Sequence, residues 1–188
     1  MRLFVAIHVP EDIRMTIAIL LRELQRIAPA LKWNKPENLH VTLKFLGEAD
    51  ASQLDSVVKA MFTVARTAHP ITLNLAGLGF FPNARRPNVL WAGVHTSANA
   101  QSIVQEINHH LDVLGFAREK QRQFTPHLTL LRLNKPALSR DLQSATERNA
   151  SRVFGGFTAT EFHLIESKLK STGAEYTILH SFSFLAEA

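Results

Sequence analysis

One short sequence occurs twice in the chain, and it constrains the fold more than any other feature. His40-Val41-Thr42-Leu43 recurs as His127-Leu128-Thr129-Leu130, so both copies follow the pattern His, apolar, Thr, Leu. Each copy lies in a short apolar run typical of a buried strand, Leu39–Leu46 and Phe124–Leu133. The sequence therefore predicts two strands, far apart in the chain, that carry the same pair of polar side chains.

Alternation along each strand predicts where these side chains point. Neighbouring residues face opposite sides of a strand, so the histidine and threonine of each copy share one face about 6.5–7 Å apart. The apolar residues belong to the other face, which we expect in the core: Leu39, Val41, Leu43 and Phe45 in the first copy, Leu128 and Leu130 in the second. Lys44 is expected on the face of His40 and Thr42.

The rest of the chain alternates between strand-like and helix-like segments. No linker, charge block or low-complexity segment divides residues 1–188, so we expect one α+β domain with largely antiparallel sheet. Further strands are expected at Leu3–Val9, Ile71–Leu78, Asn88–Val94, Phe154–Leu169 and Tyr176–Leu185, the last two as a closing antiparallel pair. Helices are expected at Pro10–Ile27, Asp50–His69, Ala98–Leu114 and Leu138–Arg148.

Composition excludes several kinds of chemistry. The chain has no cysteine, which rules out disulfides, thiolate nucleophiles and cysteine-ligated metals and fits a reducing, cytoplasmic location. No apolar run approaches the roughly 20 residues of a membrane helix. The 21 basic and 16 acidic residues give a net charge of +5, which is compatible with a polyanionic partner and equally with ordinary solubility.

Two histidine–threonine pairs fit the chemistry of a phosphodiester. Histidine titrates near pH 6.5, so one ring can remove a proton from an attacking oxygen while another protonates the leaving oxygen. The threonine hydroxyls can donate hydrogen bonds to the anion between them, and no metal is required. A lone His-x-Thr on a strand is more often a structural pair, but two copies favour a functional one. Zinc is the weaker alternative, because threonine is a poor ligand and no third ligand is evident.

The motifs and their flanks resemble the 2H phosphoesterase superfamily, and within it the bacterial RNA 2′,3′-cyclic phosphodiesterases, also called 2′-5′ RNA ligases. The resemblance covers nearly the whole chain. It rests on Asn38–Gly47 and Phe124–Arg132 around the two motifs, with further similarity in Arg2–Ile7, Val89–Val94 and Glu166–Tyr176. It implies two pseudosymmetric lobes of largely antiparallel sheet with flanking helices, each giving one motif to a central cleft.

The resemblance also implies an activity and roles for particular residues. The expected reaction is hydrolysis of an RNA terminal 2′,3′-cyclic phosphate to a 2′-phosphate, and some members also join tRNA halves reversibly through a 2′-5′ bond without ATP. His127 is the implied proton acceptor and His40 the proton donor, although the reverse reaction exchanges these roles. Thr42, Thr129 and Arg132 are the implied phosphate ligands. No cofactor or metal is implied, the partner is an RNA end, and we expect a monomer.

Other interpretations of the sequence stay open. The same residues suit a cyclic phosphodiesterase acting on small nucleotides or ADP-ribose cyclic phosphate, or an RNA-binding module without turnover. Thr125 stands where some relatives have a histidine, which removes one potential contact with phosphate or base. Arg85, Arg86 and Arg122 are candidates for the RNA backbone or for solvated loops. Phe4, Phe124 and Trp91 are candidates for base stacking, with the core the favoured alternative.

Overall fold

A computed structural model describes residues 1–116, 124–133, 139–171 and 173–185. In this part of the chain eight strands form one sheet in the order β6-β3-β4-β5-β2-β1-β7-β8, with all neighbours antiparallel. The strands are β1 (Arg2–His8), β2 (His40–Glu48), β3 (Ile71–Phe81), β4 (Val89–Thr96), β5 (His127–Arg132), β6 (Val153–Ala159), β7 (Glu161–Lys170) and β8 (Gly173–Ser183). The helices are α1 (Glu11–Ile27), α2 (Leu54–Ala65), α3 (Asn99–Val113) and α4 (Arg140–Arg148), with 3₁₀ turns η1 (Pro36–Asn38) and η2 (Ala51–Gln53).

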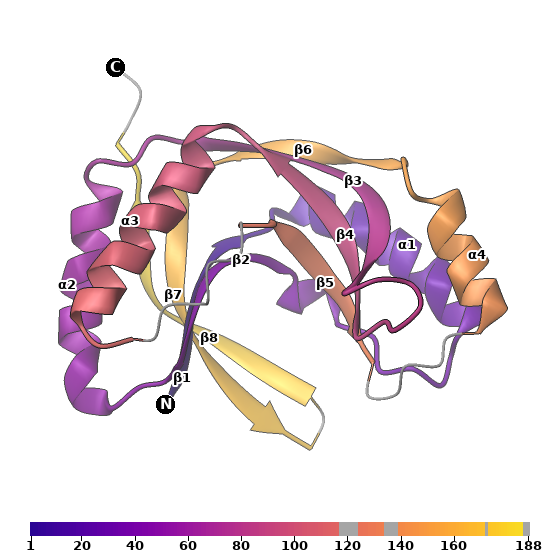
Figure 1. Ribbon diagram of the computed structural model, residues 1–188, viewed down its shortest axis with the longest axis horizontal. Coiled ribbons are helices and arrows are strands. Elements are labelled where there is room, and N and C mark those ends of the chain that lie inside the picture. Colours follow the sequence, from indigo (N-terminus) through magenta and orange to yellow (C-terminus); the bar gives the residue numbers. More distant parts are fainter. Residues whose placement is uncertain (117–123, 134–138, 172, 186–188) are drawn as a thin grey trace.

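The sheet consists of two similar halves that meet at its centre. One half is β5-β4-β3-β6 and the other is β2-β1-β7-β8. In the first half, α1 contacts β6 and α4 contacts β3. In the second half, α2 contacts β8 and α3 contacts β2 (Figure 1). This arrangement confirms the predicted α+β class with two pseudosymmetric lobes and flanking helices.

Apolar periodicity explains how the helices pack on the sheet. In α1 the residues Ile13, Ile17, Leu20, Leu21 and Leu24 recur every three or four positions and are buried, as expected for one face of a helix against a core. Pro10 precedes the first turn and Glu11 and Asp12 lie in it, where a carboxylate interacts favourably with the helix dipole. Among the described helices, none is long and apolar enough to cross a membrane.

The prediction of one strand over Phe154–Leu169 is wrong. The chain breaks at Thr160 into β6 and β7, which lie in opposite halves of the sheet. The residues on both sides of the break favour strands, so composition alone does not reveal it. Because only Thr160 separates the two strands, the sheet must curl far enough to bring edge strand β6 of one half close to β7 of the other. The closing antiparallel pair of β7 and β8 is confirmed.

Candidate active site

The two His-x-Thr motifs lie side by side at the centre of the sheet. Each histidine is the first residue of its strand, His40 in β2 and His127 in β5. The two strands pair at Val41 and Leu128, the apolar residues between the histidine and threonine of each motif. Both of these apolar side chains are fully buried. Alternation therefore places both histidines and both threonines on the opposite face, as predicted.

Both imidazole rings are held in the same way. Nδ1 of His40 lies 2.8 Å from the carbonyl oxygen of Asn38, and Nδ1 of His127 lies 2.8 Å from that of Thr125. A carbonyl oxygen only accepts, so Nδ1 carries the proton in each ring. The Nε2 atom of each neutral ring therefore has a free lone pair for proton transfer. The backbone carbonyl of Thr125 accepts the hydrogen bond from His127, so this bond does not depend on which side chain stands at position 125.

Aromatic rings surround the histidines and reduce their contact with water. The His40 ring lies 4.8 Å from Phe4 and 5.1 Å from Tyr176, and the His127 ring lies 4.9 Å from Phe81. Phe4 is buried against His40, so its role is packing in the core, which was the favoured alternative to base stacking. The sequence reasoning missed Phe81 altogether. Tyr176 entered the sequence analysis only as the last residue of a segment that resembles the family, without a role of its own.

Burial changes the protonation of both histidines. Desolvation lowers the pKa of His40 to about 4, opposed by the Asn38 carbonyl and reinforced by the positive charge of Arg132. Desolvation also lowers the pKa of His127, again with a contribution from Arg132. Both rings are thus mostly neutral at pH 7 in the free protein. The positive charge of Arg132 thus acts on both motifs.

A β-bulge explains why Arg132 reaches the site. Arg132 stands five residues after His127, and strict alternation would place it on the opposite face. In the pairing of β4 with β5, Leu90 is opposite Leu131 and Trp91 is opposite Thr129, which leaves Leu130 without a partner in β4. This extra residue reverses the alternation, so Arg132 returns to the side of His127.

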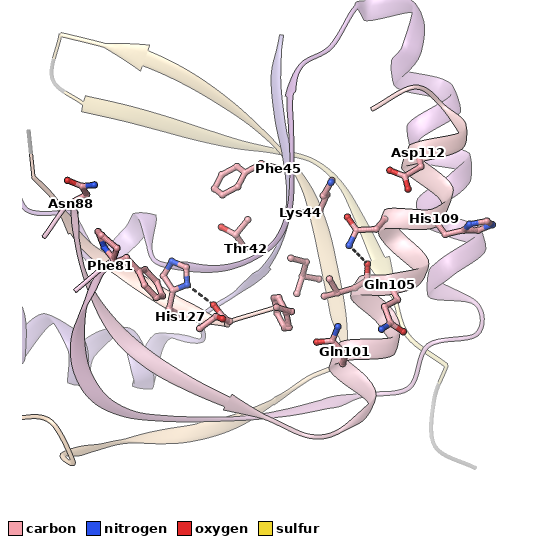
Figure 2. A pocket seen from close by; sticks show the side chains of 16 residues that line it. Thr42, Lys44, Phe45, Phe81, Asn88, Gln101, Gln105, His109, Asp112 and His127 are labelled. Atoms are coloured by element: carbon pink, nitrogen blue, oxygen red, sulfur yellow. Dashed lines mark hydrogen bonds between the residues drawn. The ribbon is translucent and has the colours of Figure 1, made fainter. Parts of the chain in front are cut away.

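The first motif contains the same bulge at the same position. In the pairing of β1 with β2, Val5 is opposite Lys44 and Ala6 is opposite Thr42, which leaves Leu43 unpaired. The prediction for the following residues is therefore wrong: Lys44 is 2% exposed and Phe45 is 44% exposed. Figure 2 shows Phe45 beside Thr42 on one side of β2, with Lys44 pointing toward α3 on the other. Phe45 is thus the counterpart of Arg132.

A cavity of about 1010 Å³ opens at the motifs. Its walls include Thr42, Phe45, Phe81 and His127, and polar residues of α3 line its far end (Figure 2). His40, Thr129 and Arg132 are not part of these walls, although Arg132 acts on both histidines electrostatically. In the described residues, no group of three His, Asp or Glu side chains could hold a metal ion.

The remaining candidates are less closely tied to this site. Arg85 and Arg86 are exposed in the loop between β3 and β4, and their role stays a prediction. Arg122 lies outside the described residues. Trp91 packs against Phe81, which is in contact with His127, so it supports the wall of the site.

Comparison with known proteins agrees with this geometry. Residues 7–91 and 94–176 match the family described as LigT-like phosphoesterases. The chain belongs to that family. It is 34% identical to the RNA 2′,3′-cyclic phosphodiesterase of Methanocaldococcus jannaschii over 179 residues, which are 95% of this chain and 98% of the relative. It is 33% identical to the protein of the same name from Archaeoglobus fulgidus over 182 residues, 97% and 99% of the two chains.

Solved structures of LigT-like proteins share the fold. TT0787 of Thermus thermophilus superimposes with a TM-score of 0.80 at 29% identity, and 98% of each chain is covered. LigT of Escherichia coli complexed with 3′-AMP also gives a TM-score of 0.80, at 25% identity and with 98% of each chain covered. The two-lobed architecture described above is thus that of LigT-like phosphoesterases.

Proposed function

We propose that the chain hydrolyses RNA ends bearing a 2′,3′-cyclic phosphate to give a 2′-phosphate. The observation that carries this proposal is the placement of two identical His-x-Thr motifs on adjacent central strands, with Nδ1 of each ring bonded to a carbonyl so that Nε2 carries the lone pair. The names of the relatives from Methanocaldococcus and Archaeoglobus support the same substrate. The aromatic-walled cavity beside the motifs suits a nucleotide.

The reaction needs one base and one acid on opposite sides of the phosphorus. His127 accepts a proton from water through Nε2, and the water oxygen bonds to phosphorus. The bond from phosphorus to the 3′-oxygen breaks, and His40 donates a proton to that oxygen. Thr42, Thr129 and Arg132 stabilise the negative charge on the remaining phosphate oxygens. The histidines then exchange protons with solvent and return to their starting states.

The position of Phe45 supports His40 as the acid. The exposed Phe45 ring belongs to the half of the site that contains His40, and it offers a stacking surface for a base. A nucleoside stacked there has its ribose oxygens on the His40 side. In-line attack then brings water from the opposite side, where His127 lies.

The assignment of His40 as the acid requires a protonated ring, and substrate binding favours that protonated form. His40 has a pKa of about 4 in the free protein, so it is mostly neutral near pH 7. A phosphodiester anion beside the ring favours its protonated form. His40 therefore takes up its proton together with the substrate and gives it to the leaving oxygen.

The same geometry serves 2′-5′ ligation of RNA ends, including tRNA halves. A 5′-hydroxyl in place of water attacks phosphorus, His127 accepts its proton, and the product is a 2′-5′ phosphodiester with a free 3′-hydroxyl. The strained cyclic phosphate supplies the driving force, so no nucleotide triphosphate takes part.

The decisive experiment is product analysis with an RNA that ends in a 2′,3′-cyclic phosphate. We expect a terminal 2′-phosphate, activity that persists in EDTA, and a loss of at least about 100-fold in kcat for His40→Ala and for His127→Ala. A 3′-phosphate product would overturn the assignment of the leaving oxygen. Abolition by EDTA would overturn the two-histidine mechanism. Binding without turnover would favour an RNA-binding module.

A further inference from the structure

The segment that leads into β2 crosses over to the second motif before it reaches the first. Trp33 forms a bridge with Leu131 of β5. The backbone N–H of Asn34 donates to the carbonyl of Leu130 at 2.9 Å, and its side-chain Nδ2 donates to the carbonyl of Thr129 at 2.7 Å. Residues 33–34 therefore occupy the edge of β5 just beyond the point where β2 pairs with it at Leu128.

These contacts lie on the bulge that directs Arg132. Leu130 has no partner in β4. Its carbonyl accepts from the backbone N–H of Asn34, and the carbonyl just before it, that of Thr129, accepts from the Asn34 side chain. An unpaired carbonyl inside a protein costs free energy, so both donors stabilise the bulged conformation, and the one to Thr129 depends on the asparagine side chain. The bulge in turn sets the face on which Arg132 emerges.

We propose that Asn34 is a positioning residue of the active site, which holds the β5 bulge at the Thr129 carbonyl and thereby directs Arg132. The proposal rests on the proposed function for its kinetic test. Asn34 touches the backbone of the second motif although it precedes the first motif by only six residues, so it also ties the two halves of the site together.

The other end of the same segment holds the first half of the site. The carbonyl of Asn38 accepts the hydrogen bond from His40, and the Asn38 side chain donates to the carbonyl of Ala174 at 3.0 Å. Ala174 precedes by two residues Tyr176, whose ring lies against His40. The segment from Trp33 to Asn38 therefore contacts the supports of both histidine motifs and sets their relative placement.

A double-mutant cycle tests whether Asn34 acts through Arg132. Asn34→Ala removes the side-chain donor to Thr129, and we expect kcat/KM to fall about tenfold, mainly through KM. In an Arg132→Ala background the same change should alter kcat/KM by less than about twofold, because the guanidinium is already gone. Asn99→Ala is the matched control, since that side chain also donates to backbone carbonyls, of His69 and Pro70, away from the motifs.

Histidine titration by NMR gives a second readout that does not depend on turnover. Arg132 lowers the pKa of His40 and of His127, so Arg132→Ala should raise both values. Asn34→Ala should also raise the pKa values of both histidines, whereas Asn99→Ala should leave them unchanged. If Asn34→Ala does not fold, Asn34→Leu removes the amide donor without adding a charge and without the loss of side-chain volume, and it takes the place of Asn34→Ala in both experiments.

Each outcome decides the proposal. Equal losses from Asn34→Ala in the two backgrounds, or an unchanged pKa of both histidines, would overturn the positioning role. A wild-type protein that does not turn over cyclic phosphate would defeat the proposed function alone, because the titration still tests how Asn34 acts on Arg132.

Discussion

Replacing His40 should make the protein less sensitive to acid, because this ring is neutral and partly buried in the folded state. Its pKa is about 4 in the folded protein and 6.5 in an unfolded chain. Between these values the unfolded state binds a proton that the folded state does not, so stability falls as the pH falls. From about pH 8 to about pH 5 the loss due to His40 is about 2 kcal/mol.

The measurement is urea unfolding of the wild type and of His40→Asn at both pH values. The asparagine amide can still donate to the Asn38 carbonyl but does not titrate. We expect the variant to lose about 2 kcal/mol less than the wild type between about pH 8 and about pH 5. His69→Asn, at an exposed histidine, serves as the control and should lose as much as the wild type. Equal losses in wild type and His40→Asn would refute the reasoning.

Three further predictions concern catalysis. Both histidine pKa values are lowered below 6.5, so kcat/KM should fall as the pH rises above about 6.5. In the complex with substrate, the phosphate favours the protonated form of His40, so kcat should fall only at higher pH. Identical pH profiles of kcat/KM and kcat would contradict this. Arg132→Ala should raise KM by at least about tenfold and Arg132→Lys by less, since only the guanidinium offers a bidentate contact; equal effects in the two variants would argue against that contact. Phe45→Ala should raise KM for RNA ends about fivefold or more with a smaller change in kcat, whereas Phe45→Trp should retain affinity for RNA ends. An unchanged KM in Phe45→Ala would show that no base stacks on Phe45.

The sequence predicted the central strands and their motifs because two independent signals agreed there. The repeated tetrapeptide marked the residues, and alternation gave them a face. Both signals are local, and Val41 and Leu128 are buried as alternation requires. The order of the strands in the sheet depends on pairing between distant segments, which one sequence does not contain. For that reason the motifs were predicted individually, and their adjacency came only from the family resemblance.

The errors arose where the backbone departs from regular geometry. A bulge adds one residue without any marker in the composition, so Lys44 and Phe45 were placed on the wrong faces. Arg132 lies after the equivalent bulge, and only the resemblance identified it as a site residue. Asn34 was missed because its contacts are made to the backbone of β5, which leaves no complementary residue type to recognise.

The two equivalent bulges also bear on how a nearly symmetric site would perform the asymmetric reaction that we propose. Each half presents a histidine with Nδ1 bonded to a carbonyl two residues earlier, and then a threonine. The fold therefore gives the two histidines no difference in tautomer. The next residue on the same face differs, because the bulge brings forward Phe45 in one half and Arg132 in the other. An aromatic ring suits a base and a guanidinium suits a phosphate, so we expect a nucleotide to bind in one direction. In the proposed reaction, Phe45 and Arg132 thus set the direction in which the substrate binds and reacts.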